Sequence, residues 1–255
     1  MLGSQFAFLQ AGTHGIVRLL RFSDGKIGDI LGNVILEGAK GKIDKFDKIG
    51  LHYNIVADQI YKERLGRDPF DESFLPYIIA GLISFDLGRM MGTERYDVKR
   101  SKSFASRLKC KLQRIQKETR IKQLLSFSLT QIDLELYKDD IDQAYNILSA
   151  PGRYGLHNKG KFFHVGATKI LHFLNPNLFI IVDSNAIRAF QKAHGVRPKH
   201  SAELYRERMK HARSDIMEHG LKNFVALDKP GVPITRIYDK LTFVTGYESR
   251  KSKHT

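Results

Sequence analysis

The sequence predicts a mainly α-helical fold, and three observations support this prediction. Apolar residues recur at spacings of three and four along most of the chain, which is the period of a helix with one buried face. The 255 residues, 42% of them hydrophobic, suffice to bury a core in one large domain or two small ones. Turn-forming pairs separate the apolar segments at Asp68-Pro69, Pro151-Gly152 and Asn175-Pro176.

The elements of the first half follow from this pattern. Residues 1–50 are rich in glycine and weakly patterned, so short strands, turns or a lack of order are all compatible with them. A helical domain is expected to span 51–249 and to begin with a helix at 51–65. The segment 73–91 is apolar nearly all round, which is typical of a central buried helix. Phe104, Leu108, Leu112 and Ile115 predict one buried face of a basic helix over 104–123.

The second half predicts shorter elements. One or two helices are expected at 130–148, followed by a basic loop at 153–164 and a helix at about 165–174. The apolar run LFIIV is too short for a helix, and Asp183 follows it directly. A helix then covers SNAIRAFQKAH, and Gly195 is expected to end it in the left-handed conformation. Helices at 201–219 and 231–246 and a frayed basic tail at 250–255 complete the chain.

The composition excludes several classes of protein. A single cysteine, Cys110, allows no internal disulfide and no four-cysteine metal site, and it fits a reducing compartment. Apolar runs fall short of the roughly 20 residues that a bilayer span needs. His164 and His172 are poorly spaced for a metal on one helix and are expected to be polar surface or substrate contacts. We therefore expect a cytoplasmic protein without metal, cofactor or membrane partner.

The net charge of +15 predicts a polyanionic partner, most commonly nucleic acid. The excess is concentrated: residues 95–122 carry eleven basic and two acidic side chains, whereas 1–94 are nearly balanced. A helix with so few acidic partners would repel itself, and a phosphate backbone would relieve that repulsion. The alternative is a solvated basic helix.

Asp183 is the only acidic residue between 143 and 202, a stretch with eight basic residues and five histidines. A carboxylate weakens phosphate binding, so its presence among these cations suggests a function. Aspartate directly before a helix is also a favoured N-cap, and the two roles are compatible. We predict a working centre between His157 and Arg188.

The stretch FFHVGATKILHFLNPNLFIIVDSNAIRAF resembles the core of the helix-hairpin-helix DNA glycosylases, the endonuclease III and 8-oxoguanine glycosylase superfamily. The resemblance covers about 75–190. Its elements are a hairpin at Val165-Gly166, a lysine at 169, and Asp183 at the start of the next helix. The run KILHFLNP with the following DS is also similar to an uncharacterised prokaryotic family.

The resemblance implies base excision from DNA, the preferred partner over RNA. Asp183 would be the essential carboxylate, and Lys169 would be the nucleophile if the enzyme also cleaves the strand. Gly166 would let backbone N–H groups approach a phosphate, and Thr168, Lys159 and Lys161 would complete that site. His164 and Arg188 would add further nucleic-acid contacts.

Each of these residues also has an ordinary structural interpretation. Lys169 could be a solvated helix residue, and Gly166 a turn glycine without a ligand. Phe162 and Phe163 are expected in the core, with insertion between bases as the alternative. Arg236 and Asp239 are expected to form a local pair in the last helix. Two other functions remain open: a non-catalytic helix-hairpin-helix module that holds nucleic acid, and a protein-interaction or defence protein.

Overall fold

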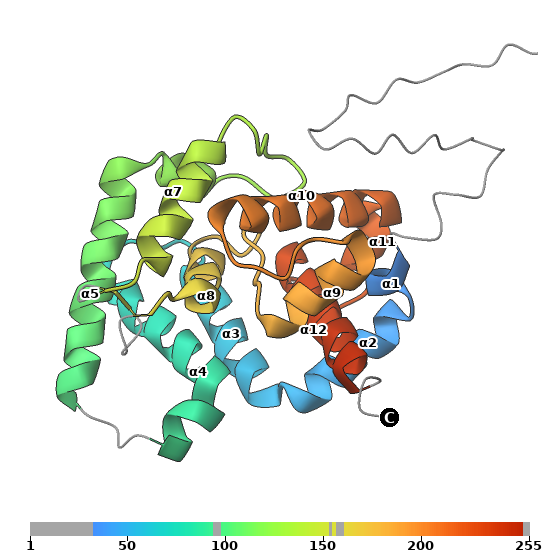
Figure 1. The fold of residues 1–255 in the computed structure, drawn as a ribbon, viewed down its shortest axis with the longest axis horizontal. Helices are drawn as coiled ribbons and strands as arrows, with labels where there is room; N and C mark the ends of the chain where they lie inside the picture. Colours follow the sequence, from blue (N-terminus) through green and yellow to red (C-terminus); the bar gives the residue numbers. More distant parts are fainter. Residues whose placement is uncertain (1–32, 94–97, 153–154, 157–160, 252–255) are drawn as a thin grey trace, which may run out of the picture.

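The computed structural model describes residues 33–93, 98–152, 155–156 and 161–251, with the backbone alone at 33, 52, 85–93 and 98–103. Every regular element in these ranges is a helix, which confirms the predicted fold class (Figure 1). The first elements are α1 (Asn33–Leu36), α2 (Ala39–Ile49), α3 (Leu51–Arg64), the 3-10 turn η1 (Glu72–Phe74), α4 (Leu75–Thr93), α5 (Val98–Glu118) and α6 (Ile121–Leu124). The later ones are α7 (Lys138–Ser149), α8 (His164–Leu174), α9 (Ser184–His194), α10 (Ala202–His219), α11 (Leu221–Val225) and α12 (Ile234–Lys251).

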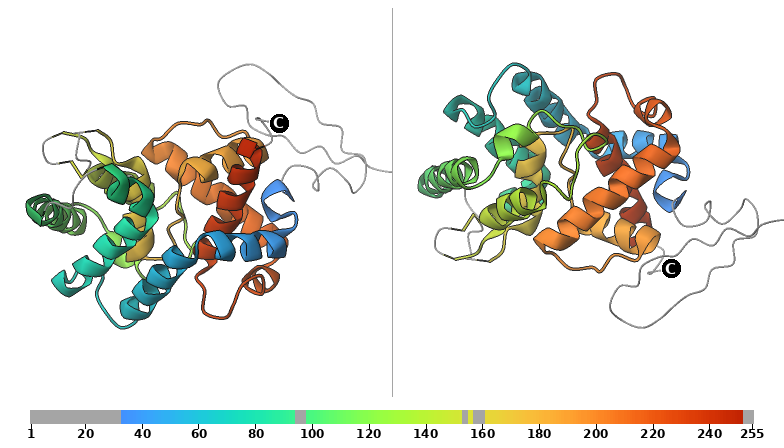
Figure 2. Two further views of the ribbon diagram at one scale, coloured as in Figure 1. Left: turned by 90° about the horizontal axis from the view of Figure 1, so that it is seen from below. Right: turned by 90° about the horizontal axis from the view of Figure 1, so that it is seen from above.

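The helices form two groups that lie side by side (Figure 1). In one group α12 packs along α9, and α1 and α2 cover this pair. In the other group α7 contacts α5, α8 and α10, while α4 contacts α3 and α8. Figure 2 shows α5 at one edge of the molecule and α10 running along both groups. Among the helices described, none combines the length and apolar character needed to cross a bilayer.

Most predicted helices are confirmed, and their bounds shift by a few residues. α5 begins six residues before the predicted helix, and the expected stripe of Leu108, Leu112 and Ile115 is buried. Gly195 ends α9 with φ 67°, as predicted. α1 and α2 lie within residues 1–50, the segment to which the sequence assigned no definite structure. α12 likewise continues into the expected tail as far as Lys251.

The apolar run after α8 forms the centre of the core without regular structure. Leu178, Phe179, Ile180, Ile181 and Val182 are each at most 1% exposed. Buried backbone groups need hydrogen-bond partners, and side chains from several helices supply them. Tyr205 donates to the carbonyl of Ile180 over 3.0 Å, and the carbonyl of Phe179 lies 2.8 Å from Nδ1 of His172. The run is therefore held firmly, and it leads directly to Asp183.

Candidate nucleic-acid interface

Asp183 caps the N-terminus of α9, as the sequence predicts. Its Oδ1 accepts hydrogen bonds from the backbone N–H groups of Asn185 and Ala186, both at 2.8 Å. These bonds satisfy two of the donors that every helix start leaves unpaired. The residue as a whole is half-buried. Capping accounts for Oδ1 but assigns no hydrogen bond to Oδ2.

Thr168 fixes the backbone directly before Asp183. Its hydroxyl accepts from the N–H of Val182 over 3.1 Å and donates to the carbonyl of Val165 over 2.9 Å. The residue is 1% exposed. The hydroxyl therefore positions the chain from the inside and does not face a phosphate, contrary to the role inferred from the resemblance.

A close approach between α12 and the start of α9 completes this part of the scaffold. A Cβ built on Gly246 would lie 1.9 Å from the carbonyl oxygen of Asn185. Only a glycine lets the two backbones come this close. The contact places the last turn of α12, with Arg250, beside the first turns of α9.

A buried ion pair lies behind Asp183. Asp239 is 4% exposed and pairs with Arg236, which is 2% exposed. Arg236 lies over the rings of Tyr53 and Phe46, with its guanidinium carbon 4.2 and 4.7 Å from their centroids. The predicted local pair is thus confirmed, and it lies in the interior of the protein.

Lys169 and Asp183 both act electrostatically on this buried pair. The pKa of Asp239 is raised to about 6, mainly by burial and in part by the negative charge of Asp183, while Arg236 opposes the rise. Lys169 lowers the same pKa. The proposed nucleophile and the proposed carboxylate therefore lie near one buried acid, although they are 14 residues apart in sequence.

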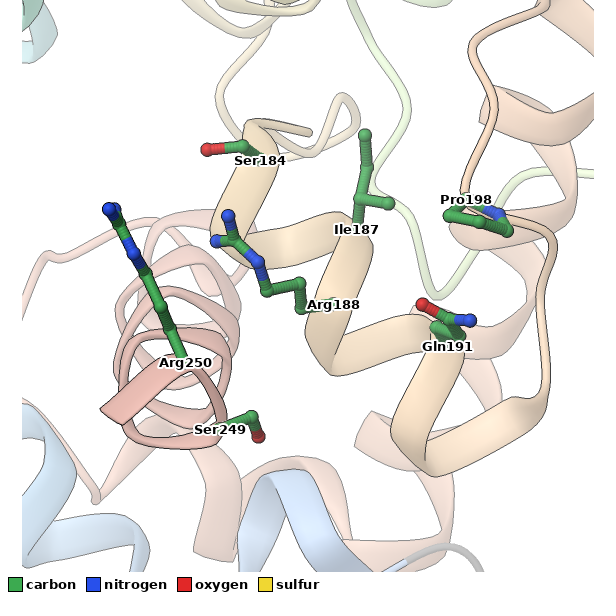
Figure 3. Close-up of a pocket in the computed structure, with 7 residues that line it drawn as sticks. All are labelled: Ser184, Ile187, Arg188, Gln191, Pro198, Ser249 and Arg250. Atoms are coloured by element: carbon green, nitrogen blue, oxygen red, sulfur yellow. The ribbon is translucent and has the colours of Figure 1, made fainter. Parts of the chain in front are cut away.

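A pocket of about 440 Å³ lies between α9 and α12, and its lining includes Ser184, the residue that follows Asp183. Figure 3 shows its lining side chains: Ser184, Ile187, Arg188, Gln191, Pro198, Ser249 and Arg250. Arg188 and Arg250 extend from the two helices into the same region, with Ser184 at the start of α9 close by (Figure 3). This arrangement places two cations, hydroxyl groups and an amide around one space.

The charge in this pocket is not balanced by its own lining. None of the seven lining residues is acidic. Arg188 donates from Nη1 to the amide oxygen of Asn185 over 2.8 Å, which orients the guanidinium without neutralising it. Two neighbouring guanidinium groups repel each other, and an anion between them would relieve the repulsion. The pocket therefore has the chemistry of a phosphate site.

The remaining predicted site residues are distributed differently from the expected hairpin. Gly166 lies inside the first turn of α8 and not in a tight turn, and a Cβ there would meet the ring of Phe163 at 1.9 Å. Its function is to accommodate that ring, because Phe163 folds back over the helix start. Lys161 is exposed. Lys159 lies outside the described residues.

The two histidines of this region have different environments. His172 is fully buried, with Nε2 2.7 Å from the hydroxyl of Tyr61, and burial lowers its pKa to about 3. The expectation of a surface or substrate contact was wrong for this residue. His164 is half-buried, and its Nδ1 lies 3.0 Å from the hydroxyl of Tyr145.

The basic run also proves less isolated than its sequence suggests. Arg120 binds Asp140 at 2.7 Å, and Lys122 lies 3.7 Å from Asp68. Lys111 is 6% exposed and donates to a backbone carbonyl of α7. Acidic residues from distant segments thus pair with cations at the end of the basic run, which have few acidic neighbours in sequence.

Arg250 was not predicted as a site residue, because it was assigned to a frayed tail, whereas it lies in the last turn of α12. The apolar period of the last helix extends as far as Tyr247, and this signal favours a longer helix.

Among the described residues, no group of three or more His, Cys, Asp and Glu side chains is placed to hold a metal ion. Comparison of the chain with protein-family models, curated proteins and solved structures finds no match.

Proposed function

We propose that the protein binds nucleic acid, with a backbone phosphate in the pocket between Arg188 and Arg250, and cleaves an N-glycosidic bond beside Asp183. The observation that carries the binding is the pair of guanidinium groups in a pocket whose lining contains no carboxylate. The net charge of +15 supports the same partner. The catalytic role rests on the resemblance to helix-hairpin-helix glycosylases together with the place of Asp183 directly before Ser184, which lines this pocket.

The phosphate would be bound by charge and by hydrogen bonds together. Arginine presents a planar set of donors that suits two phosphate oxygens at once. Ser184, at the first position of α9, adds a hydroxyl. These contacts read the backbone and not the bases, so they position a strand without selecting its sequence.

The bond cleaved would join C1′ of the sugar to the nitrogen of a damaged base. The base leaves with the bonding electron pair, and positive charge develops on the sugar. The carboxylate of Asp183 stabilises that charge and accepts a proton from the water that attacks C1′. In a strand-cleaving enzyme the amine of Lys169 would attack C1′ in place of water. The target base has to leave the duplex stack before either attack.

The exchange Asp183→Asn tests the catalytic part, because asparagine caps a helix about as well as aspartate does. On a panel of duplexes with single lesions, the wild-type protein should release at least one base. The variant should release none and should bind DNA as well or more tightly, since one negative charge is lost. Asp71→Asn is the matched control, because Asp71 also caps a turn, accepting from Ser73 over 2.7 Å. Equal base release by Asp183→Asn and wild type would exclude the mechanism.

Binding without catalysis is a second candidate, and the geometry of Asp183 favours it. One oxygen of this carboxylate is already occupied by two backbone N–H groups, and Thr168 contributes no ligand contact. A non-catalytic protein would bind the same duplexes, release no base from any of them, and form no covalent adduct under borohydride.

A further inference from the structure

Three aromatic rings form a parallel stack at the start of α8. The rings of Phe162 and His164 lie 4.8 Å apart with an angle of 6° between their planes. His200, directly before the N-cap of α10, lies at the same centroid distance from His164 with an angle of 3°. Phe162 is 58% exposed, so a large part of its ring faces solvent. Its predicted place in the core was wrong, whereas Phe163 is half-buried and packs on Phe104.

The stack is held in place by buried polar groups. Tyr145 binds His164 through its hydroxyl at 3.0 Å, and its own ring stacks on Tyr205. Arg208, which is 1% exposed, donates from Nη2 to the carbonyls of Arg197 and Lys199, both at 2.8 Å. These two bonds fix the chain that leads to His200. Because the rings are already fixed, a ligand that joins the stack would pay little for ordering them.

The rings of the stack carry little charge at neutral pH, and exposed cations lie close to them in sequence. Burial lowers the pKa of His164, and it lowers that of His200 to about 4, so both imidazoles are uncharged. Lys161, Arg197 and Lys199 are exposed nearby in sequence. An uncharged aromatic surface with a basic rim is the usual design for binding single strands, because bases stack on the rings while cations attract the phosphates.

We propose that the exposed face of Phe162 stacks against an unpaired nucleobase, either in a single strand or displaced from a duplex. This inference rests on the proposed nucleic-acid binding and specifies its substrate. Every base has a planar π face, so the stack would accept any of the four bases. The ligand class is therefore a single-stranded or locally opened segment of nucleic acid.

A short single strand that carries 2-aminopurine tests the proposal with the full-length protein. Stacking quenches this base, so its fluorescence should fall as wild-type protein is added. Phe162→Ala should abolish the quenching and weaken single-strand binding by about fivefold to a hundredfold, the usual range for one stacked base. Phe162→Trp should retain both. Leu136→Ala is the matched control, since Leu136 is 60% exposed and its loss removes apolar surface without removing a ring.

The possible outcomes separate this proposal from the general one. If wild type binds no oligonucleotide at low salt, nucleic-acid binding itself fails. If it binds but neither quenches 2-aminopurine nor weakens on Phe162→Ala, only the stacking fails. If Leu136→Ala weakens binding as much as Phe162→Ala, the effect comes from exposed apolar surface in general, and the stacking proposal fails. Phe162→Ala should unfold at the wild-type denaturant concentration, because the side chain is mostly exposed.

Discussion

Replacing Gly246 with alanine should push α12 away from the start of α9 and lower the free energy of unfolding. The added Cβ would lie 1.9 Å from the carbonyl oxygen of Asn185, 2.5 Å from its carbonyl carbon and 2.8 Å from its Cα. All three atoms belong to the backbone, so no side-chain rotation can make room. Two packed helices would have to separate by more than an ångström, and the cost would be shared by the whole α9–α12 contact.

The magnitude follows from two opposing effects. Overpacking a core by one group costs typically about 1–3 kcal/mol, and a backbone clash belongs to the upper part of that range. Alanine in place of glycine inside a helix returns about 0.5–1 kcal/mol. The net loss should be about 1–2 kcal/mol, which lowers Tm by roughly 2–8 °C in a protein of this size.

Urea denaturation and thermal unfolding followed by circular dichroism measure this loss. Gly41→Ala in α2 is the matched control, because a Cβ there meets nothing within 4 Å. That variant should gain about 0.5–1 kcal/mol from helix propensity alone. If Gly246→Ala is as stable as wild type, or gains as much as Gly41→Ala, the close approach of the two helices is wrong. The position of Arg250 beside Arg188 would then be wrong as well, because it depends on the same helix contact.

Three further predictions test the phosphate pocket, the pH dependence and the support of Asp183. Arg188→Ala and Arg250→Ala should each reduce the slope of log K against log salt by about 1, as loss of one phosphate contact does. Because burial lowers the pKa of His200 to about 4, below its unfolded value of 6.5, its stabilising contribution is complete above pH 6.5 and is lost as the pH falls toward 4. Stability curves of His200→Gln should be flatter in that window. Thr168→Val should cost about 1–3 kcal/mol by leaving the N–H of Val182 buried without a partner.

Each of these predictions has its own control. Arg114→Ala should leave the salt slope unchanged, because Glu118 already pairs with this arginine at 2.9 Å. An unchanged slope in both pocket variants would exclude a phosphate there. The pKa of Asp239 shifts in the opposite direction, upward to about 6, so only the difference between wild type and His200→Gln reports on the histidine. If the stability curves of wild type and His200→Gln have the same pH dependence, the burial of His200 is contradicted. Thr168→Ser keeps the hydroxyl, and a loss as large as that of Thr168→Val would contradict the hydrogen bond.

The sequence alone determined the features that depend on near neighbours along the chain. The helix at 184–194 was predicted with its capping Asp183 and its stop at Gly195, because both signals lie within one turn of the helix ends. The run from Leu178 to Val182 was predicted to be non-helical because it is too short for a helix. The pair of Arg236 and Asp239 was predicted from a spacing of three residues.

Only the tertiary structure decided which distant residues share a site. Arg250 lines the same pocket as Arg188 because Gly246 lets α9 and α12 touch. His200 stacks on His164 because Arg208 fixes the loop that leads to His200. The pattern of apolar residues shows that a face is buried, but it does not show against what. Pairing across the core depends on helix packing and on contacts between residues far apart in sequence, and no local spacing encodes those.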